Sequence, residues 1–209
     1  MLTITKIKLG AFSANCYVVR SEDFDALVVD PGADGGAISK IIGHCRLTVR
    51  GYLLTHGHID HIGALSELRG QIPAPVFMHG ADSRWAFSSA NHLLPYYAAP
   101  PRAEAVEHVL KGGEKWREYA FNLEVIATPG HSPGGVCYYF PDDNLLFSGD
   151  TLFRDSIGRT DLPAGDAQQL NASLAALARL PPRTKVYPGH GPETTIGREL
   201  EHNPFLQPR

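Results

Sequence analysis

The chain has 209 residues, a formal net charge of −3 at pH 7, 43% hydrophobic residues and 20% charged residues. This length supports one sizeable hydrophobic core, and we expect a single domain over residues 1–209. The weak negative charge disfavours nucleic acid and membrane surfaces as partners, and the absence of any run of 18 apolar residues disfavours a membrane span. The first residues lack the apolar block of a secretion signal, so we expect a cytoplasmic protein; composition leaves the oligomeric state open.

The first half of the chain mixes strand patterns with short helix patterns. Apolar and polar residues that alternate indicate strands, and apolar residues three or four apart indicate helices. Strands are predicted at residues 3–9, 16–20, 26–29, 49–54 and 75–78. Helices are predicted at residues 37–45, 62–69 and 81–92, the last ending before Pro95.

The second half repeats this order without repeating the sequence. Strands are predicted at residues 120–127, 135–140, 144–147 and 185–187, with residues 141–144 as a hairpin turn. Helices are predicted at residues 166–180, where Asp166 can cap the first turn, and at residues 194–201. Strands followed by a helix, twice over, indicate an α+β sandwich of two sheets with helices outside.

The three cysteines favour a reducing compartment. Cys16, Cys45 and Cys137 are odd in number, far apart and form no Cys-x-x-Cys pair. Cys16 and Cys137 lie in apolar, strand-like segments, so we expect both to be buried as small hydrophobic residues.

The densest chemical feature is a His-x-His-x-Asp-His motif formed by His56, His58, Asp60 and His61. It follows the apolar run at residues 52–54 and therefore lies at the end of a predicted strand. Imidazole and carboxylate are the ligands that zinc, iron and manganese select. A turn from strand into helix can direct the first pair of side chains to one point and the second pair to another close by. The motif therefore predicts two neighbouring metal ions.

Three further ligand-type residues follow predicted strands in the same way. His131 follows the apolar-rich run 123–127, Asp150 follows residues 145–146, and His190 follows residues 185–186. Each is preceded by a glycine, which lets the backbone turn tightly and approach a bound group closely. We expect these segments to gather at one edge of the fold. The other histidines, at positions 44, 79, 92, 108 and 202, lie outside this pattern.

The motifs HxHxDH, PGHSPG, SGDTLF and PGHG occur in this order, and in this the chain resembles the metallo-β-lactamase superfamily. Within it, the chain is most similar to the short bacterial glyoxalase II-like hydrolases, which lack a C-terminal helical domain. The resemblance extends from VDPG at residues 29–32 through GRTD at 158–161 to HNPFL at 202–206. It implies a four-layer αβ/βα sandwich, two mixed β-sheets flanked by helices, with the metals at one sheet edge. Because this fold hosts many chemistries, the motifs specify the superfamily more narrowly than the activity.

The resemblance also implies that seven residues hold two divalent metal ions, with zinc as the first candidate and iron or manganese as alternatives. These ligands are His56, His58 and His131 at the first ion, Asp60, His61 and His190 at the second, and Asp150 as the bridge between them. Asp60 and Asp150 are in addition the expected catalytic residues. A carboxylate suits the bridging position because each of its oxygens can serve one cation.

Two cations this close predict a hydrolase. They lower the pKa of a shared water from about 15.7 towards about 7, which supplies hydroxide at neutral pH for attack on a polarised carbonyl. The tetrahedral oxyanion is then stabilised electrostatically. A thioester suits this scheme because its thiolate leaves without strong acid assistance, and the expected substrate is a small hydroxyacylglutathione-like thioester. Asp30 is either the residue that orients a ligand histidine or a turn residue before Pro31.

Two groups of residues are candidates for substrate contacts. Arg159 and Asp161 of the GRTD element follow the bridging aspartate by a short loop, and a guanidinium suits a substrate carboxylate. The alternative is a salt-bridged structural loop. Phe153, Tyr96 and Tyr97 are candidates to line an apolar groove, although aromatic residues also serve as core.

The chain departs from full-length glyoxalase II after its last histidine motif. The full-length enzymes continue into a helical domain that supplies basic groups to glutathione, whereas here residues 191–209 follow His190. We therefore expect the main glutathione site to be absent or built differently. Arg198, Arg159 and Arg154 are the candidate replacements.

The alternative function is a mono-iron oxidoreductase. Persulfide dioxygenases share the implied fold and the GRTD element, and they hold one iron at the positions of His56, His131 and Asp150. Their last motif is usually His-Asp-Tyr, whereas this chain has Pro-Gly-His-Gly. A true β-lactamase is expected to carry an export signal, and a nucleic-acid phosphodiesterase of this fold an inserted domain. A structural zinc module is expected to contain cysteine ligands.

Overall fold

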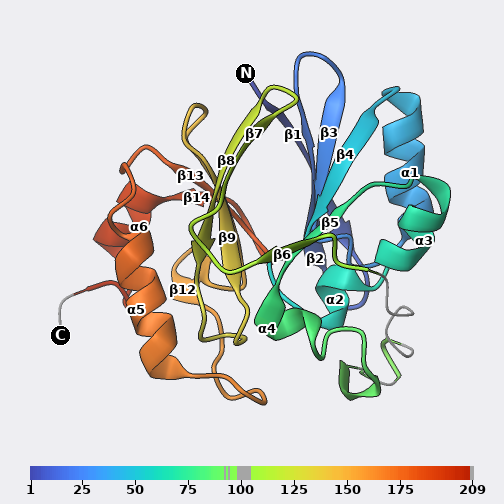
Figure 1. The fold of residues 1–209 in the computed structure, drawn as a ribbon. Helices are drawn as coiled ribbons and strands as arrows, with labels where there is room; N and C mark the ends of the chain where they lie inside the picture. Colours follow the sequence, from blue (N-terminus) through green and yellow to red (C-terminus); the bar gives the residue numbers. More distant parts are fainter. Residues whose placement is uncertain (92, 94, 98–104, 208–209) are drawn as a thin grey trace.

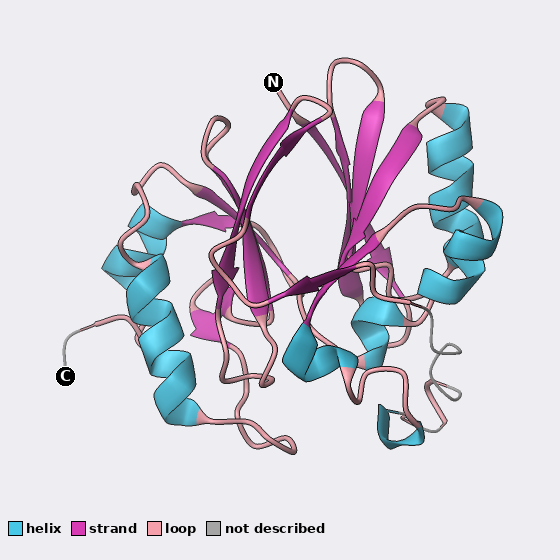
Figure 2. Ribbon diagram, viewed as in Figure 1, coloured by secondary structure: helices cyan, strands magenta, loops and turns pink. Residues whose placement is uncertain are grey.

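The computed structural model describes residues 1–91, 93, 95–97 and 105–207, which form four layers (Figures 1 and 2). Two six-stranded sheets face each other, and helices cover the outer face of each. The strand orders are β1-β2-β3-β4-β5-β6 in the first sheet and β14-β13-β10-β9-β8-β7 in the second. The predicted fold class, two mixed sheets flanked by helices, is therefore confirmed. No helix in these ranges is long and apolar enough to span a bilayer.

The first sheet is antiparallel at one side and parallel at the other. Its strands are β1 (Thr3–Leu9), β2 (Ala14–Arg20), β3 (Asp25–Val29), β4 (Thr48–Leu53), β5 (Val76–His79) and β6 (His108–Leu110). The helices on this side of the molecule are α1 (Gly35–His44), α2 (Ile59–Ile62), α3 (Leu65–Gln71) and α4 (Gly80–Ser83). Because β3, β4, β5 and β6 pair in parallel, their carboxyl ends lie at one edge.

The second sheet presents the ends of three strands at one edge as well. Its strands are β7 (Lys115–Glu118), β8 (Phe121–Ala127), β9 (Val136–Phe140), β10 (Leu145–Gly149), β13 (Lys185–Pro188) and β14 (Thr194–Thr195). The small hairpin β11 (Leu152–Phe153) and β12 (Ser156–Ile157) and the helices α5 (Ala167–Leu177) and α6 (Ile196–His202) complete this half. Strand β9 is antiparallel to β8 and β10, and β10 is parallel to β13. Strands β8, β10 and β13 therefore run in the same direction.

Alternate residues of each strand enter different cores, as the pleat requires. On β2, Val18 packs in the core beneath α1 and α3, whereas Val19 packs between the sheets. Two of the cysteines are buried as expected: Cys16 in the first of these cores, and Cys137 in a third core beneath α5 and α6. Cys45 is exposed.

Most predicted strands lie within one or two residues of those observed, but three predictions differ. Strands β6, β7, β11, β12 and β14 were not predicted because all five are short, and β6 and β7 are also largely exposed and lack a clear alternation. Strand β14 takes the first two residues of the helix predicted at residues 194–201, which therefore begins at Ile196. The helix predicted at residues 81–92 is wrong: only α4 and the 3₁₀ turn Ser89–Asn91 form, and His92 lies outside the described residues. The side chains of Asp82 and Asn91 both form hydrogen bonds with the backbone of Gly57. These long-range contacts bend the segment and prevent one continuous helix.

The third difference is at the metal motif, where the helix predicted at residues 62–69 begins earlier and is interrupted. Helix α2 ends at Ile62 and α3 starts at Leu65. Between them, Gly63 packs so closely on the backbone of Gly32 that a Cβ atom would lie 2.4 Å from its carbonyl oxygen. This contact places the end of α2 beside the loop that follows β3.

Candidate metal centre

The strand ends gather all seven predicted ligands at one edge of the sandwich. His56 and His58 lie in the loop after β4, and Asp60 and His61 lie in α2, which follows that loop. The other three follow the three strands of the second sheet that run in the same direction: His131 after β8, Asp150 after β10 and His190 after β13. Both halves of the molecule therefore contribute side chains to one place.

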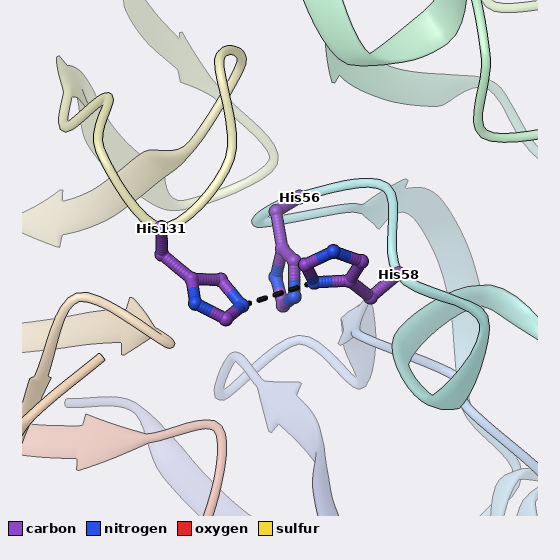
Figure 3. Close-up of side chains that lie close together, drawn as sticks. All are labelled: His56, His58 and His131. Carbon is purple, nitrogen blue, oxygen red and sulfur yellow. Dashed lines mark hydrogen bonds between the residues drawn. The ribbon is translucent and has the colours of Figure 1, made fainter. Parts of the chain in front are cut away.

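The first group consists of His56, His58 and His131, whose rings converge (Figure 3). Each offers one ring nitrogen, and these nitrogens lie within 4.8 Å of one another. Nδ1 of His58 is 2.9 Å from Nε2 of His131. Three imidazole nitrogens at such distances can share one cation.

The second group consists of Asp60, His61 and His190, whose ligand atoms also lie within 4.8 Å of one another. Nε2 of His190 is 3.3 Å from Oδ2 of Asp60 and 3.3 Å from Nε2 of His61. This group therefore offers two nitrogens and one carboxylate to a second cation.

Asp150 lies between the two groups. One of its oxygens, Oδ2, is 3.6 Å from Nε2 of His131 and 3.6 Å from Nε2 of His190, and Oδ1 is 3.5 Å from Nε2 of His61. The turn that delivers it needs glycine: Gly149 has φ +47°, and a Cβ atom on Gly189 would lie 2.2 Å from Oδ1 of Asp150. Asp150 thus contacts both groups, as the bridging position requires.

Hydrogen bonds behind the ligands fix the orientation of their rings. Asp30, which is 2% exposed, accepts hydrogen bonds from the backbone N–H of Thr55 at 2.8 Å, the hydroxyl of Thr55 at 2.6 Å and Nδ1 of His61 at 3.0 Å. Because the Thr55 hydroxyl donates to Asp30, its oxygen can accept from Nδ1 of His56 at 3.0 Å. Asp30 therefore orients the ring of His61, a predicted ligand, and this is one of the two roles that the sequence allowed for it. Asp30 also lies close enough to His56 and His61 to be a metal ligand. Because both of its oxygens already accept hydrogen bonds, we do not include it among the proposed ligands.

His131 is oriented by the GRTD element, through the main chain. Its Nδ1 donates to the backbone carbonyl of Arg159 at 2.8 Å, which leaves Nε2 facing His58 and Asp150. The Arg159 side chain forms two 2.7 Å contacts with the carboxylate of Asp161, and both side chains are largely exposed. The pair lies beside the first group, and the role of Arg159 in substrate binding stays a prediction.

The two groups differ in charge. Burial lowers the pKa of His56 well below its ordinary value, and burial together with the His131 ring lowers the pKa of His58 to about 3. These imidazoles are neutral at physiological pH and ready to bind a cation. Burial also disfavours a charged His61, but the carboxylates of Asp60, Asp150 and Asp30 outweigh it and raise its pKa to about 10. The second group is therefore a locus of negative charge that attracts cations.

Two atoms at the centre support the fit to metal ions. Nε2 of His56 and Oδ1 of Asp150 are buried and have no hydrogen-bond partner within the described part of the chain. Buried polar atoms in proteins are nearly always paired. A cation at each group would give both atoms a partner, and histidine with carboxylate is the donor set that zinc, iron and manganese accept.

Aromatic rings border the two groups. The ring of Phe153 lies 6.3 Å from that of His190, and the ring of Trp85 lies 5.4 Å from that of His58. Tyr96 and Tyr97, the other predicted groove residues, instead pack with Phe12, at ring distances of 5.4 and 5.6 Å. Of the three predicted groove residues, Phe153 is therefore the one beside a predicted metal-binding residue, His190.

Arg198 and Arg154, two of the arginines predicted as candidates for glutathione binding, are engaged in ion pairs. Arg198 contacts Asp155 at 2.7 and 3.0 Å and Glu199 at 2.8 Å. Arg154 lies 3.7 Å from the same Asp155 carboxylate. These contacts hold the tip of the β11–β12 hairpin, and we infer a structural role for Arg198.

Four supporting residues were not predicted: Thr55, Asp82, Trp85 and Asn203. Asn203 is fully buried and donates to the backbone oxygens of Ser156 at 3.0 Å and Phe153 at 3.4 Å, which positions the hairpin beside His190. Asp82 follows β5 through His79-Gly80, the same pattern of strand, glycine and polar residue that identified the ligands. That pattern was the available signal for Asp82.

Comparison with known proteins agrees with the superfamily resemblance seen in the sequence. The family model described as the metallo-β-lactamase superfamily matches residues 9–190. The chain is 41% identical to the "Probable metallo-hydrolase YqgX" of Bacillus subtilis, covering 96% of each chain. It is 32% identical to the "Hydroxyacylglutathione hydrolase GloC" of Haemophilus influenzae, covering 98% of each.

Solved structures are similar over nearly the whole chain. BLEG-1, described as a B3 metallo-beta-lactamase, has a TM-score of 0.93 at 41% identity, covering 99% of this chain and 100% of its own. TTHA1623, in a di-iron-bound form, has a TM-score of 0.81 at 36% identity, with coverage of 97% and 100%. ETHE1 from Myxococcus xanthus has a TM-score of 0.76 at 29% identity, with coverage of 97% and 83%.

Proposed function

Since this chain belongs to the metallo-β-lactamase superfamily, we propose that it is a metal-dependent hydrolase of the glyoxalase II type, which cleaves a small thioester with two divalent cations. The observation that carries the proposal is Asp150, whose carboxylate lies within 3.6 Å of nitrogens from both ligand groups. The similarity to hydroxyacylglutathione hydrolase GloC supports a glutathione thioester as the first substrate to test. Zinc is the first candidate metal, with iron and manganese as alternatives.

The proposed ligands are His56, His58 and His131 for one cation, Asp60, His61 and His190 for the other, and Asp150 for both. When bound, the cations supply a hydroxide nucleophile at neutral pH and polarise the carbonyl under attack. Asp60 remains ionised: burial opposes its charge, but His61 and the hydrogen bond from His190 hold its pKa below the usual range. The chain thus supplies two anionic catalytic residues, Asp60 and Asp150, that offset the positive charge at the centre.

The surrounding side chains suit a thioester. Phe153 and Trp85 border the two groups and offer apolar surface to an acyl chain. We propose that Phe153 contacts the substrate directly and that Arg159, exposed beside His131, attracts a substrate carboxylate. A thiolate leaving group departs without a proton donor, so the site needs no general acid.

A mono-iron oxidoreductase of the persulfide dioxygenase kind is the second candidate. The contact that favours it is the 3.6 Å approach of Asp150 to His131 beside His56, the three positions implied for a single iron. The similarity to ETHE1 supports testing it. The equally close grouping of Asp60, His61 and His190 favours the two-cation hydrolase.

Metal quantification and parallel assays test the proposal. The protein is purified anaerobically, its metal content is measured, and it is offered S-lactoylglutathione, glutathione persulfide with an oxygen electrode, and a chromogenic β-lactam. We expect two cations per chain and thioester turnover. One iron per chain with oxygen uptake, or β-lactam cleavage without thioester turnover, would overturn the proposed activity.

A matched pair of histidine variants serves as the internal control. His190→Asn removes a proposed ligand, whereas His44→Asn changes an exposed histidine at the end of α1. We expect His190→Asn to lose the second cation and turnover, and His44→Asn to keep both. Equal behaviour of the two variants would mean that His190 is not a ligand.

A further inference from the structure

Asp82 lies outside the proposed ligand set, yet its carboxylate connects the two loops that carry the first group. The residue is fully buried on α4. Its Oδ2 accepts from the backbone N–H of Gly57 at 2.8 Å and from the hydroxyl of Ser132 at 2.7 Å. Its Oδ1 accepts from the backbone N–H of Gly134 at 2.6 Å and from Nε1 of Trp85 at 3.3 Å.

These donors flank the three histidines of the first group. Gly57 lies between His56 and His58, and Ser132 and Gly134 follow His131. One loop comes from the first sheet and the other from the second, so the carboxylate fixes their separation. Gly134 packs so closely on Asp82 that a Cβ atom there would lie 2.7 Å from its Oδ1.

Gly57 is held from its carbonyl side as well. The side-chain amide of Asn91 donates to the carbonyl oxygen of Gly57 at 2.6 Å and to that of Ala86 at 2.7 Å. Both polar groups of the Gly57 backbone are therefore bound to the segment after β5. No contact of this kind joins Asp82 to Asp60, His61 or His190 in the described part of the chain, so the arrangement serves one group.

We propose that Asp82 is a positioning residue that preassembles the His56–His58–His131 group and thereby sets the affinity of the first cation, independently of the second. This inference rests on the proposed two-cation site. The four donors that converge on it hold the two histidine-bearing loops at the spacing that one cation needs. Supporting hydrogen bonds of this kind typically change metal affinity by about 10- to 100-fold.

The substitution Asp82→Asn tests the proposal because it keeps shape and removes acceptor capacity. Its amide nitrogen cannot accept from a backbone N–H. The side-chain orientation that loses the fewest hydrogen bonds turns this nitrogen towards Ser132, because the Ser132 hydroxyl can accept a hydrogen bond instead of donating one. The backbone N–H of Gly57 then has no acceptor, and the loop between His56 and His58 is released.

The measurement is the binding of two equivalents of Co²⁺ to metal-free protein, by calorimetry and visible absorption. In Asp82→Asn we expect the first-group dissociation constant to rise by about 10- to 100-fold and the second-group constant to stay within about threefold. Quenching of Trp85 fluorescence identifies the ion bound by the first group, because the Trp85 ring lies 5.4 Å from the ring of His58. The Trp116→Phe background removes the other tryptophan.

Two further variants separate positioning from stability. Asp25→Asn changes another buried aspartate, which pairs with Arg50 at 2.7 Å at the start of β3, and should leave both constants unchanged. Ser132→Ala removes one of the four donors and should weaken only the first ion, by less than about tenfold. If Asp82→Asn does not fold, Ser132→Ala decides the question.

Each outcome has one meaning. Selective loss of the first ion supports the proposal. Unchanged binding in Asp82→Asn, or equal weakening of both ions, overturns the positioning role while the two-cation site stands. Failure of the wild-type protein to bind two cations refutes the proposed function instead.

Discussion

The sharpest test of the centre is Asp30→Asn, because one carboxylate holds ligands of both groups. The asparagine carbonyl can keep the 2.8 Å hydrogen bond from the Thr55 backbone. Its amide then replaces the oxygen that accepts from the Thr55 hydroxyl and from Nδ1 of His61. An amide N–H can donate to Nδ1 only if the His61 proton moves to Nε2, the atom that faces His190 and Asp150. The variant thus stabilises the tautomer that cannot bind a cation.

The magnitude follows from these contacts. Loss of a supporting hydrogen bond costs about 10- to 100-fold in metal affinity, which is about 1.4 to 2.7 kcal/mol. Loss of the hydrogen bond between His61 and a charged carboxylate costs the metal-free protein about 1.5 to 3 kcal/mol of unfolding free energy. Calorimetric metal titration measures the first quantity, and urea unfolding with chelator present measures the second.

The control is Asp34→Asn, an exposed residue four positions further on whose side chain makes no capping hydrogen bond. It should match the wild-type protein in both measurements. If Asp30→Asn is destabilised but binds the second cation as tightly as the wild-type protein, the reasoning is refuted. Asp30 would then act as a turn residue, the other role that the sequence allowed.

Three further predictions concern the bridge, the hairpin and the thiols. Asp150→Asn should weaken the retention of both cations by more than about tenfold and nearly abolish turnover, and normal activity would show that the bridge is misassigned. Asn203→Ala should lower the unfolding free energy by about 1 to 3 kcal/mol, because it unpairs two partly buried carbonyls of the hairpin that carries Phe153; a urea titration with an unchanged midpoint would contradict this. Cys45 is the exposed thiol, whereas burial raises the pKa of the other two. A thiol reagent should therefore modify one cysteine in the folded protein and three after unfolding, and two reactive thiols in the folded state would refute the assigned burial.

The order of the motifs along the chain was sufficient to predict the layers and the gathering of the seven ligand-type residues at one edge. The apolar runs of β4, β8, β10 and β13 can be recognised in the sequence, and a glycine precedes the ligand-type residue that follows β8, β10 and β13. Parallel strands bring their carboxyl ends to one edge, so gathering followed from the topology. The predicted turn from strand into helix at Asp60 and His61 is also observed. It could be predicted because the apolar run stops at Leu54.

Contacts between segments distant in sequence could not be predicted. Asp82 connects residues 25 and 50 positions away, Gly57 and Ser132, and although it follows a strand and a glycine, nothing local indicates these two partners. The helix pattern at residues 81–92 was overridden by these tertiary hydrogen bonds. Similarly, Arg159 orients His131 through its backbone carbonyl, which every residue has, so its side chain gave no indication of this role.

The division of ligands between the two halves of the sandwich has a consequence for biosynthesis. Each cation would draw ligands from both sheets: His56 and His58 with His131, and Asp60 and His61 with His190. By this assignment neither half could chelate an ion fully by itself, so a nascent chain would hold both metals only after His190 has left the ribosome and the two sheets have docked. Each ion would then link the two sheets and would add about 2.7 kcal/mol to the unfolding free energy at a free concentration about 100 times its dissociation constant.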